Sequence, residues 1–82
     1  MFDRIMEWQN YIHSNPEILS GRPVVKGTRL SVEFILKLFA NGWTEEQVLR
    51  NYLHLTPELL RAVFAYAADG LMAENFLPVS HA

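Results

Sequence analysis

The sequence predicts a mainly helical domain: a three-helix, helix-turn-helix bundle of the homeodomain-like or winged-helix-like kind, preceded by a short β element. Three helix-start signals, at Ser31, Thr44 and Thr56, follow one another at short intervals. Short β-branched segments lie before the first of them. Half of the 82 residues are hydrophobic and 20% are charged, which indicates a globular chain, and no linker divides it. We therefore expect residues 1–82 to form a single domain.

The part of the chain before residue 31 is predicted to contain one short helix and a small β element. Apolar positions between residues 2 and 8 have near-helical spacing, which predicts a short helix. Residues 11–14 alternate weakly and end at an Asn-Pro turn signal, which predicts a short strand. Residues 23–25 are rich in β-branched side chains, and Gly27 can supply the positive φ of a tight turn. A small β element is therefore expected before the helices.

The first two helices are delimited by their capping residues. Ser31 can cap a helix over residues 32–40, and Gly42 suits the left-handed position just past its end. Thr44 begins the second helix, and Gln47, three residues later, completes a capping box. Both helix starts are thus predicted from side chains that are close together in the sequence.

The third helix is predicted to begin after Thr56, which is followed by a proline at the first helical position and an acid in the first turn. We expect this helix to run to about Asp69 and to end at Gly70. Three helices joined by tight turns are typical of a trihelical helix-turn-helix unit.

The first and third helices carry more apolar surface than one short partner helix can cover. This excess predicts a subunit interface and a homodimer. The alternative is that the N-terminal segment, with Trp8 and Tyr11, folds over these helices. The interface candidates are Phe34, Leu38, Trp43, Phe64 and Tyr66.

The basic side chains are concentrated in one part of a chain whose net charge is −2. Residues 22–37 carry a local charge of +3, so the rest sums to −5, although such asymmetry is also within ordinary surface variation. In a trihelical unit the later helix often enters the major groove, but here its outward face has one arginine and two acids. Phosphate contacts are therefore expected mainly from the basic loop and the first helix. The DNA-binding candidates are Arg22, Lys26, Arg29, Lys37 and Arg61.

Several classes of site have no support in the sequence. Cysteine is absent, and the three histidines lack the spacing of metal ligands, so we expect no metal and no cofactor. His54, between two helices, is expected to cap or pack. Residues 21–28 superficially resemble a phosphate-binding loop, but five residues separate the glycines where four are needed, and no lysine follows the second. Without a nucleophile–base pair, we expect a binding protein rather than an enzyme.

The sequence also points away from membranes. It has no apolar run near the ~20 residues that a membrane span requires. Its N-terminus lacks the basic and apolar regions of a secretory signal. We therefore expect a cytoplasmic protein with no membrane partner.

Four segments of the chain resemble one known family in their order and spacing. They are residues 16–19, the stretch 21–29 with its glycine-basic-proline and glycine-threonine-arginine motifs, residues 40–46, and the leucine-threonine stretch 53–56. On these motifs the chain resembles the domain-of-unknown-function 433 (DUF433) family over about residues 8–70, with a short tail at 71–82. The resemblance implies a small helix-turn-helix-like domain with a short N-terminal β element. It also implies a VapB-like antitoxin that neutralises a PIN-like nuclease toxin and binds its own promoter DNA.

Two hypotheses for the function follow. The first is an antitoxin-type, dimeric DNA-binding regulator, in which Arg22, Lys26, Arg29 and Lys37 contact phosphates and Arg61 reaches a base or phosphate. The second is a protein-interaction or dimerisation module without DNA binding, in which Arg29 pairs internally with an acid. A buried, ion-paired Arg29 favours the second hypothesis. An exposed Arg29 beside Arg22 and Lys26 favours the first.

Overall fold

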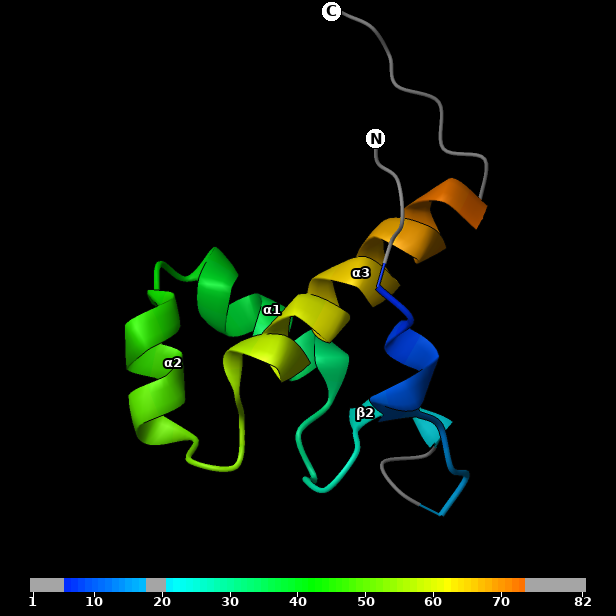
Figure 1. Ribbon diagram of the computed structural model, residues 1–82, viewed down its shortest axis with the longest axis horizontal. Coiled ribbons are helices and arrows are strands. Elements are labelled where there is room, and N and C mark those ends of the chain that lie inside the picture. Colours follow the sequence, from blue (N-terminus) through cyan, green and yellow to red (C-terminus); the bar gives the residue numbers. More distant parts are fainter. Residues whose placement is uncertain (1–5, 18–20, 74–82) are drawn as a thin grey trace, which may run out of the picture.

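The computed structural model describes residues 6–17 and 21–73. The elements are a 3-10 helix η1 (Trp8–Asn10), strands β1 (Ile12–His13) and β2 (Val24–Val25), and helices α1 (Val32–Ala40), α2 (Glu45–Asn51) and α3 (Pro57–Ala73). In Figure 1, α2 lies at one end of the molecule and η1 with the strands at the other, with α1 and α3 between them. The predicted architecture, three helices after a short β element, is confirmed.

The β element is a two-stranded antiparallel sheet. Ile12 pairs with Val25 and His13 with Val24, and the two valines are buried. The turn after β2 uses Gly27 at φ 82°, as expected for a residue without a Cβ. The hydroxyl of Thr28 donates to the Val25 carbonyl at 2.8 Å and closes this turn. The turn after β2 therefore leads directly to the start of α1.

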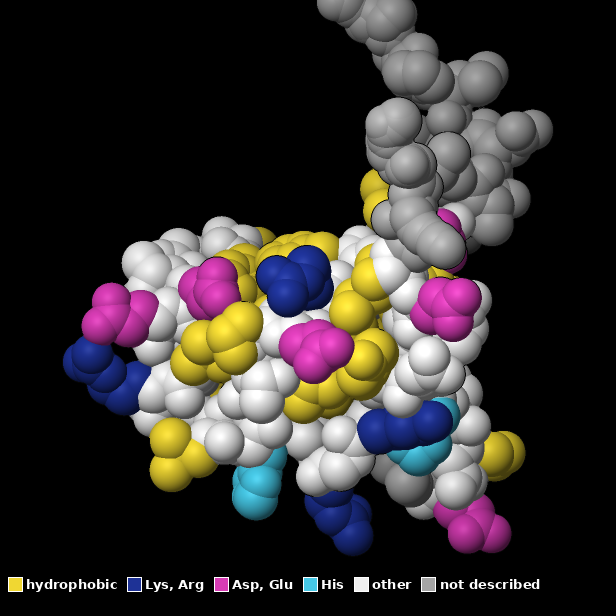
Figure 2. Space-filling view, in the orientation of Figure 1, with side chains coloured by type: hydrophobic (Ala, Val, Ile, Leu, Met, Phe, Trp, Pro, Cys, Tyr) yellow, Lys and Arg dark blue, Asp and Glu magenta, His cyan; other side chains and the backbone are white. Residues whose placement is uncertain are grey.

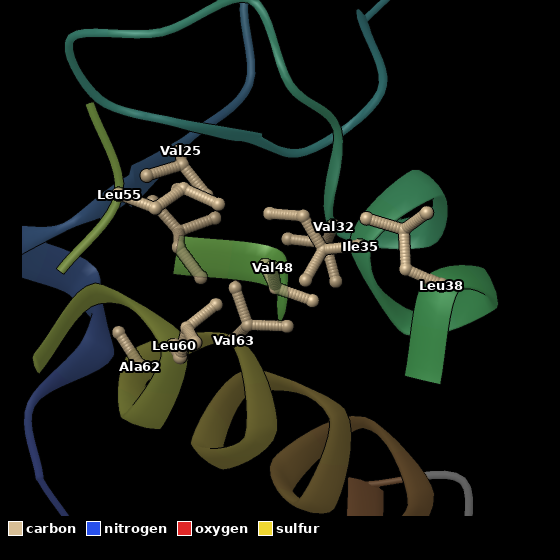
Figure 3. Close-up of a cluster of buried hydrophobic side chains, with 10 residues drawn as sticks. Val25, Val32, Ile35, Leu38, Val48, Leu55, Leu60, Ala62 and Val63 are labelled. Carbon is tan, nitrogen blue, oxygen red and sulfur yellow. The ribbon is translucent and has the colours of Figure 1, made fainter. Parts of the chain in front are cut away.

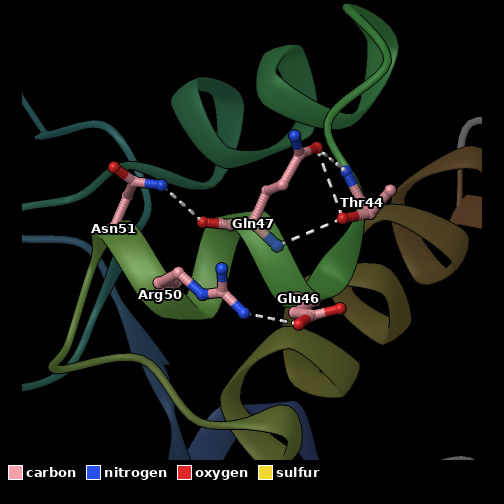
Figure 4. Close-up of polar contacts among 5 residues, drawn as sticks. All are labelled: Thr44, Glu46, Gln47, Arg50 and Asn51. Carbon is pink, nitrogen blue, oxygen red and sulfur yellow. Dashed lines mark hydrogen bonds and ion pairs between the residues drawn. The ribbon is translucent and has the colours of Figure 1, made fainter.

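The predicted caps of α1 and α2 are confirmed. The Ser31 Oγ accepts a hydrogen bond from the Phe34 N–H at 3.0 Å. Past the end of α1, Gly42 has a φ of 95°. Figure 4 shows the capping box of α2, in which the Thr44 hydroxyl accepts from the Gln47 N–H at 3.1 Å and the Gln47 side-chain oxygen accepts from the Thr44 N–H at 2.8 Å. These reciprocal bonds satisfy two donors at the start of α2.

The end of α3 differs from the prediction. The helix begins as expected, with the Thr56 hydroxyl accepting from the Leu59 N–H at 3.1 Å. It does not end at Gly70, because Gly70 keeps a helical backbone and α3 continues to Ala73. A glycine inside a helix costs only about 1 kcal/mol relative to alanine, and the leucine, methionine and alanine that follow it are strong helix formers. The helix therefore continues beyond Gly70, its predicted end.

The hydrophobic core lies where α1, α2 and α3 face one another and the β element (Figure 3). Ile35, Val48 and Val63, one from each helix, are fully buried. Leu38 is also part of this core and is 8% exposed, so its assignment as an interface residue is wrong. Its position on α1 turns it toward the interior of its own chain. The cluster comprises Ile12, Val25, Val32, Ile35, Leu38, Val48, Leu55, Leu60, Ala62 and Val63.

The N-terminal segment packs along one side of α3. The predicted helix between residues 2 and 8 is not found in its described part, where Trp8–Asn10 forms a 3-10 helix; residues 1–5 lie outside the described residues. The Trp8 indole meets the Tyr66 ring edge to face, with centroids 4.7 Å apart. Its Nε1 donates to Asp69 Oδ2 at 2.6 Å. The alternative in which this segment folds over the helices is therefore realised along α3.

A second contact of this segment reaches the start of α3. The Tyr11 hydroxyl donates to Glu58 Oε2 at 2.7 Å. This hydrogen bond, together with the negative charge of Glu58, raises the pKa of Tyr11 above its ordinary value. Tyr11 and Trp8 thus engage both acidic residues that were expected on the outward face of α3.

Candidate functional site

Three of the basic residues surround one open hollow of about 540 Å³. Arg22 comes from the segment before β2, Arg29 from the turn between β2 and α1, and Lys37 from α1. Glu33 and Phe34, in the first turn of α1, add a carboxylate and an aromatic ring to the lining of this hollow. We call this the cationic hollow. These residues are up to fifteen positions apart in the sequence. They meet there because the sheet places the basic loop next to the start of α1.

Glu33 is the electrostatic centre of the cationic hollow. Its two carboxylate oxygens lie 3.3 Å from Arg22 Nη1 and 3.3 Å from Lys37 Nζ. All three side chains are more than half exposed, so each pair contributes at most about 1 kcal/mol to stability. With Arg29, three cations face one carboxylate, and the hollow carries a formal charge of +2. The ion pairs orient two of the cations without neutralising the site.

Of the two arrangements expected of Arg29, the structure has neither in full, because Lys37 rather than Lys26 lines the hollow with Arg22 and Arg29. Arg29 is exposed, and no ion pair within the described residues includes it. It lies beside Arg22 and Lys37 in the lining of the cationic hollow. Its guanidinium is therefore available to an anion from outside the chain.

The other two DNA-binding candidates lie outside the lining of the cationic hollow. Lys26 is exposed in the turn after β2, where its N–H donates to the Tyr11 carbonyl at 2.8 Å. Arg61 is exposed on α3. The five basic residues therefore do not form a single patch, and only Arg22, Arg29 and Lys37 are brought together.

A second hollow, of about 820 Å³, adjoins the first. Arg29 and Leu30 belong to the lining of both. The new lining includes Tyr52, from the end of α2, and two histidines, His13 and His54. His54 is exposed in the connection before α3, so the expectation that it packs is wrong. We call this the histidine hollow.

An aromatic contact joins the two hollows, and it links residues from separate helices that sequence reasoning did not connect. Phe34 is 39% exposed in the cationic hollow, and its ring meets Tyr52 of the histidine hollow at a centroid distance of 5.8 Å and an angle of 83°. Trp43 lies beyond, with its centroid 6.3 Å from that of Tyr52. Only its spacing from Lys37, on the same helix, hinted that Phe34 shares a face with the basic residues.

A third exposed feature is an apolar stripe on α3. Phe64 is 45% exposed and Leu71 is 55% exposed, and their spacing places them on one side of the helix. The Phe64 ring rests against Phe39 of α1, with centroids 5.2 Å apart. On the side of the molecule that Figure 2 shows, hydrophobic side chains reach the surface between charged ones. Of the remaining interface candidates, Trp43 and Tyr66 are half-buried against the core.

Two kinds of site find no support in the part of the chain that the structure describes. No three histidine, cysteine or acidic side chains converge there in a way that could hold a metal ion. None of the helices in residues 6–17 and 21–73 has the length and apolar character to cross a bilayer.

Comparison with known proteins identifies the family. The profile of the family described as "Protein of unknown function (DUF433)" matches residues 12–67. The chain belongs to the DUF433 family. The matched residues include the whole lining of both hollows, so the cationic hollow lies inside the DUF433 domain.

Two relatives of this DUF433 protein differ from it in length. The uncharacterized protein y4eO of Sinorhizobium fredii is 34% identical over 65 residues, which cover 79% of this chain but 29% of y4eO. A DUF433 member protein from Anabaena variabilis, whose crystal structure is known, superposes with a TM-score of 0.73 at 27% identity. That match covers 82% of this chain and 66% of the Anabaena chain. The fold is thus shared with a solved member of the family.

Proposed function

We propose that this DUF433 protein is the antitoxin of a toxin–antitoxin pair, a cytoplasmic helix-turn-helix regulator that binds its own promoter DNA and neutralises a PIN-like ribonuclease. Membership of the DUF433 family, whose resemblance implies VapB-like antitoxin relatives, is the support for the class of protein. The observation that carries DNA binding is the exposed, unpaired Arg29 beside Arg22 and Lys37 around one hollow, within the described residues. The role is one of binding rather than catalysis.

The geometry favours contacts with the phosphate backbone over contacts with base edges. Glu58 and Asp69 on α3 are bonded to Tyr11 and Trp8, so the N-terminal segment occupies the side of α3 that they share. Phosphate contacts set orientation and affinity, whereas base contacts set sequence preference. We therefore propose binding that depends strongly on salt and only modestly on sequence.

The expected salt dependence can be estimated from the number of cations in the hollow. Each phosphate neutralised contributes a slope of about −0.9 in a plot of log affinity against log salt concentration. Three phosphate contacts correspond to a slope of about −2.7 for each protomer, and a homodimer doubles it. A slope near zero contradicts the proposal.

The test compares two charge reversals. Arg29→Glu is expected to abolish binding to duplex DNA from the region upstream of its gene, measured by fluorescence anisotropy at low salt. Arg50→Glu is the matched control, because Arg50 is exposed, pairs with Glu46 at 2.6 Å and lines neither hollow. Lys26→Glu tests whether the turn after β2, which lies outside the hollow, also contributes to binding. Unchanged affinity of Arg29→Glu, with circular dichroism like that of the wild type, refutes the site.

A protein-interaction module is the second candidate, and the apolar stripe on α3 favours it. Exposed large apolar side chains in a row are typical of surfaces that meet a partner, here the toxin or a second copy of the chain. Phe64→Asp is expected to abolish inhibition of the PIN-like nuclease or to dissociate a homodimer. Leu53→Asp is the control, since Leu53 is 83% exposed elsewhere. Ribonuclease assays and sedimentation velocity distinguish the two partners, and an unaffected Phe64→Asp variant in both contradicts a role for the stripe.

A further inference from the structure

We infer that the cationic hollow and the histidine hollow together form one groove that takes unpaired nucleotides of a nucleic acid, with Phe34 as the surface on which a base stacks. This inference rests on the nucleic-acid binding proposed above and specifies the form of nucleic acid that the site prefers. It is carried by the cations, the aromatic rings and the shape of the two adjoining hollows.

Three cations line the first part of the groove, and one of them also lines its second part. Arg22 and Lys37 line its first part, and Arg29 lies where the two hollows meet. The imidazoles of His13 and His54 continue the lining into the second part. A row of cations along a concave path is the arrangement by which proteins track the backbone of a single strand.

An aromatic ring is exposed among these cations. Phe34 is 39% exposed in the cationic hollow, whereas Val32, Ile35 and Leu38 of the same helix are buried. Tyr52 holds the Phe34 ring edge to face, so the ring has a defined orientation. A fixed aromatic ring beside cations can stack an unpaired base while the cations hold the flanking phosphates.

The shape of the groove favours unpaired bases over a duplex. The two hollows, about 540 and 820 Å³, are in the size range of sites for small organic ligands. In B-form DNA the bases are paired inside the duplex and present only their edges in the grooves. A duplex could therefore bind the cations, but it would leave Phe34 without a stacking partner. An unpaired base can enter the hollow and cover the ring.

The histidine hollow also contains a hydrogen-bond acceptor for a base edge that accepts from no donor within residues 6–17 and 21–73. Asn51 uses its side-chain nitrogen to donate to the Gln47 carbonyl at 2.8 Å, which leaves its side-chain oxygen available (Figure 4). The Thr28 hydroxyl, by contrast, donates to the Val25 carbonyl and accepts from the Leu30 N–H. Asn51 is thus the polar contact expected for the amino group of a second base.

The test measures the affinity of the full chain for a labelled single-stranded oligonucleotide and for a duplex of the same length, by anisotropy at low salt. Phe34→Leu is expected to weaken single-strand binding by roughly 5- to 150-fold, since each stacked base contributes about 1–3 kcal/mol. Duplex binding is expected to change by no more than about twofold. Phe34→Trp is expected to keep single-strand binding, unlike Phe34→Leu, because it keeps an aromatic ring at this position. Phe64→Leu, the same change at an exposed phenylalanine outside both hollows, is the control.

A second measurement needs no variant. A single strand containing bromouracil, cross-linked to the wild-type chain by ultraviolet light, is expected to label Phe34 or Tyr52, as located by mass spectrometry. Labelling confined to α3 overturns the inference, and so does equal loss of single-strand and duplex binding in Phe34→Leu. If the wild type binds duplex but not single strands, the inference is wrong while the proposed DNA binding stands. If it binds neither, and an acidic partner protein instead, both are wrong.

Discussion

The contact between Trp8 and Asp69 is predicted to stabilise the whole fold, although the two residues are 61 positions apart. The bond from Trp8 Nε1 to Asp69 Oδ2 is 2.6 Å long and partly buried, and its acceptor is a carboxylate. Hydrogen bonds to charged groups contribute about 1.5–3 kcal/mol. Because both side chains are only half-buried, we expect the lower end, about 1.5 kcal/mol.

A double-mutant cycle isolates this bond from the packing around it. Trp8→Phe removes the N–H donor but keeps an aromatic ring against Tyr66, and Asp69→Ala removes the acceptor. If the bond forms, the double variant should be less destabilised than the sum of the single variants by about 1.5 kcal/mol. In a domain of this size, 1 kcal/mol corresponds to a shift of about 4–8 °C in Tm.

The assay is urea unfolding followed by circular dichroism, because the helices report the fold whether or not Trp8 is present. Trp43→Phe is the control variant. It makes the same tryptophan-to-phenylalanine change at a residue whose indole has no hydrogen bond among the described residues. A coupling energy below about 0.3 kcal/mol, which is within the additivity error of such cycles, refutes the contact.

Two further predictions concern local contacts. Thr44→Ala is expected to lower the free energy of unfolding by about 1 kcal/mol, since it removes the cap of α2, whereas Thr44→Ser keeps the hydroxyl and is expected to be nearly neutral in urea unfolding. The raised pKa of Tyr11 means that its bond to Glu58 stabilises the fold below the ordinary tyrosine pKa, and that this contribution is lost as pH rises through the raised value. Absorbance titration at alkaline pH should show one tyrosine ionising late in the wild type and earlier in Glu58→Gln; identical curves contradict the contact.

The candidate site was only partly predictable. Arg22, Arg29 and Lys37 were identified as candidates from their charge alone, and the structure brings them around one hollow. Lys26 was a candidate on the same grounds, and Arg61 as the arginine on the outward face of the third helix, but both lie outside the hollow. Charge in the sequence identifies basic residues, whereas their grouping depends on the path of the chain through the sheet.

The aromatic residue of the site, Phe34, was predicted from the sequence to have a different role. Phe34 was expected at a subunit interface because it is apolar and lies on a helix with excess apolar surface. In the structure it is exposed among cations and held by Tyr52, which is eighteen positions away in the sequence. No periodicity within α1 could have indicated that neighbour.

The sequence by itself determined the starts of the helices and the tight turns of this protein. Ser31, Thr44 and Gly42 act on backbone groups within a few residues of themselves, so their effect follows from local stereochemistry. The predicted end of α3 at Gly70 was wrong because a helical glycine costs little enough to be overridden.

Only the tertiary structure decided which side chains meet across the molecule. The burial of Leu38, the hydrogen bond from Trp8 to Asp69 and the pairing of Arg22 with Glu33 all depend on how separate elements cross. Such contacts are weak individually and join residues that the sequence keeps apart. They are fixed by the shared core, which sets the positions of all the elements at once.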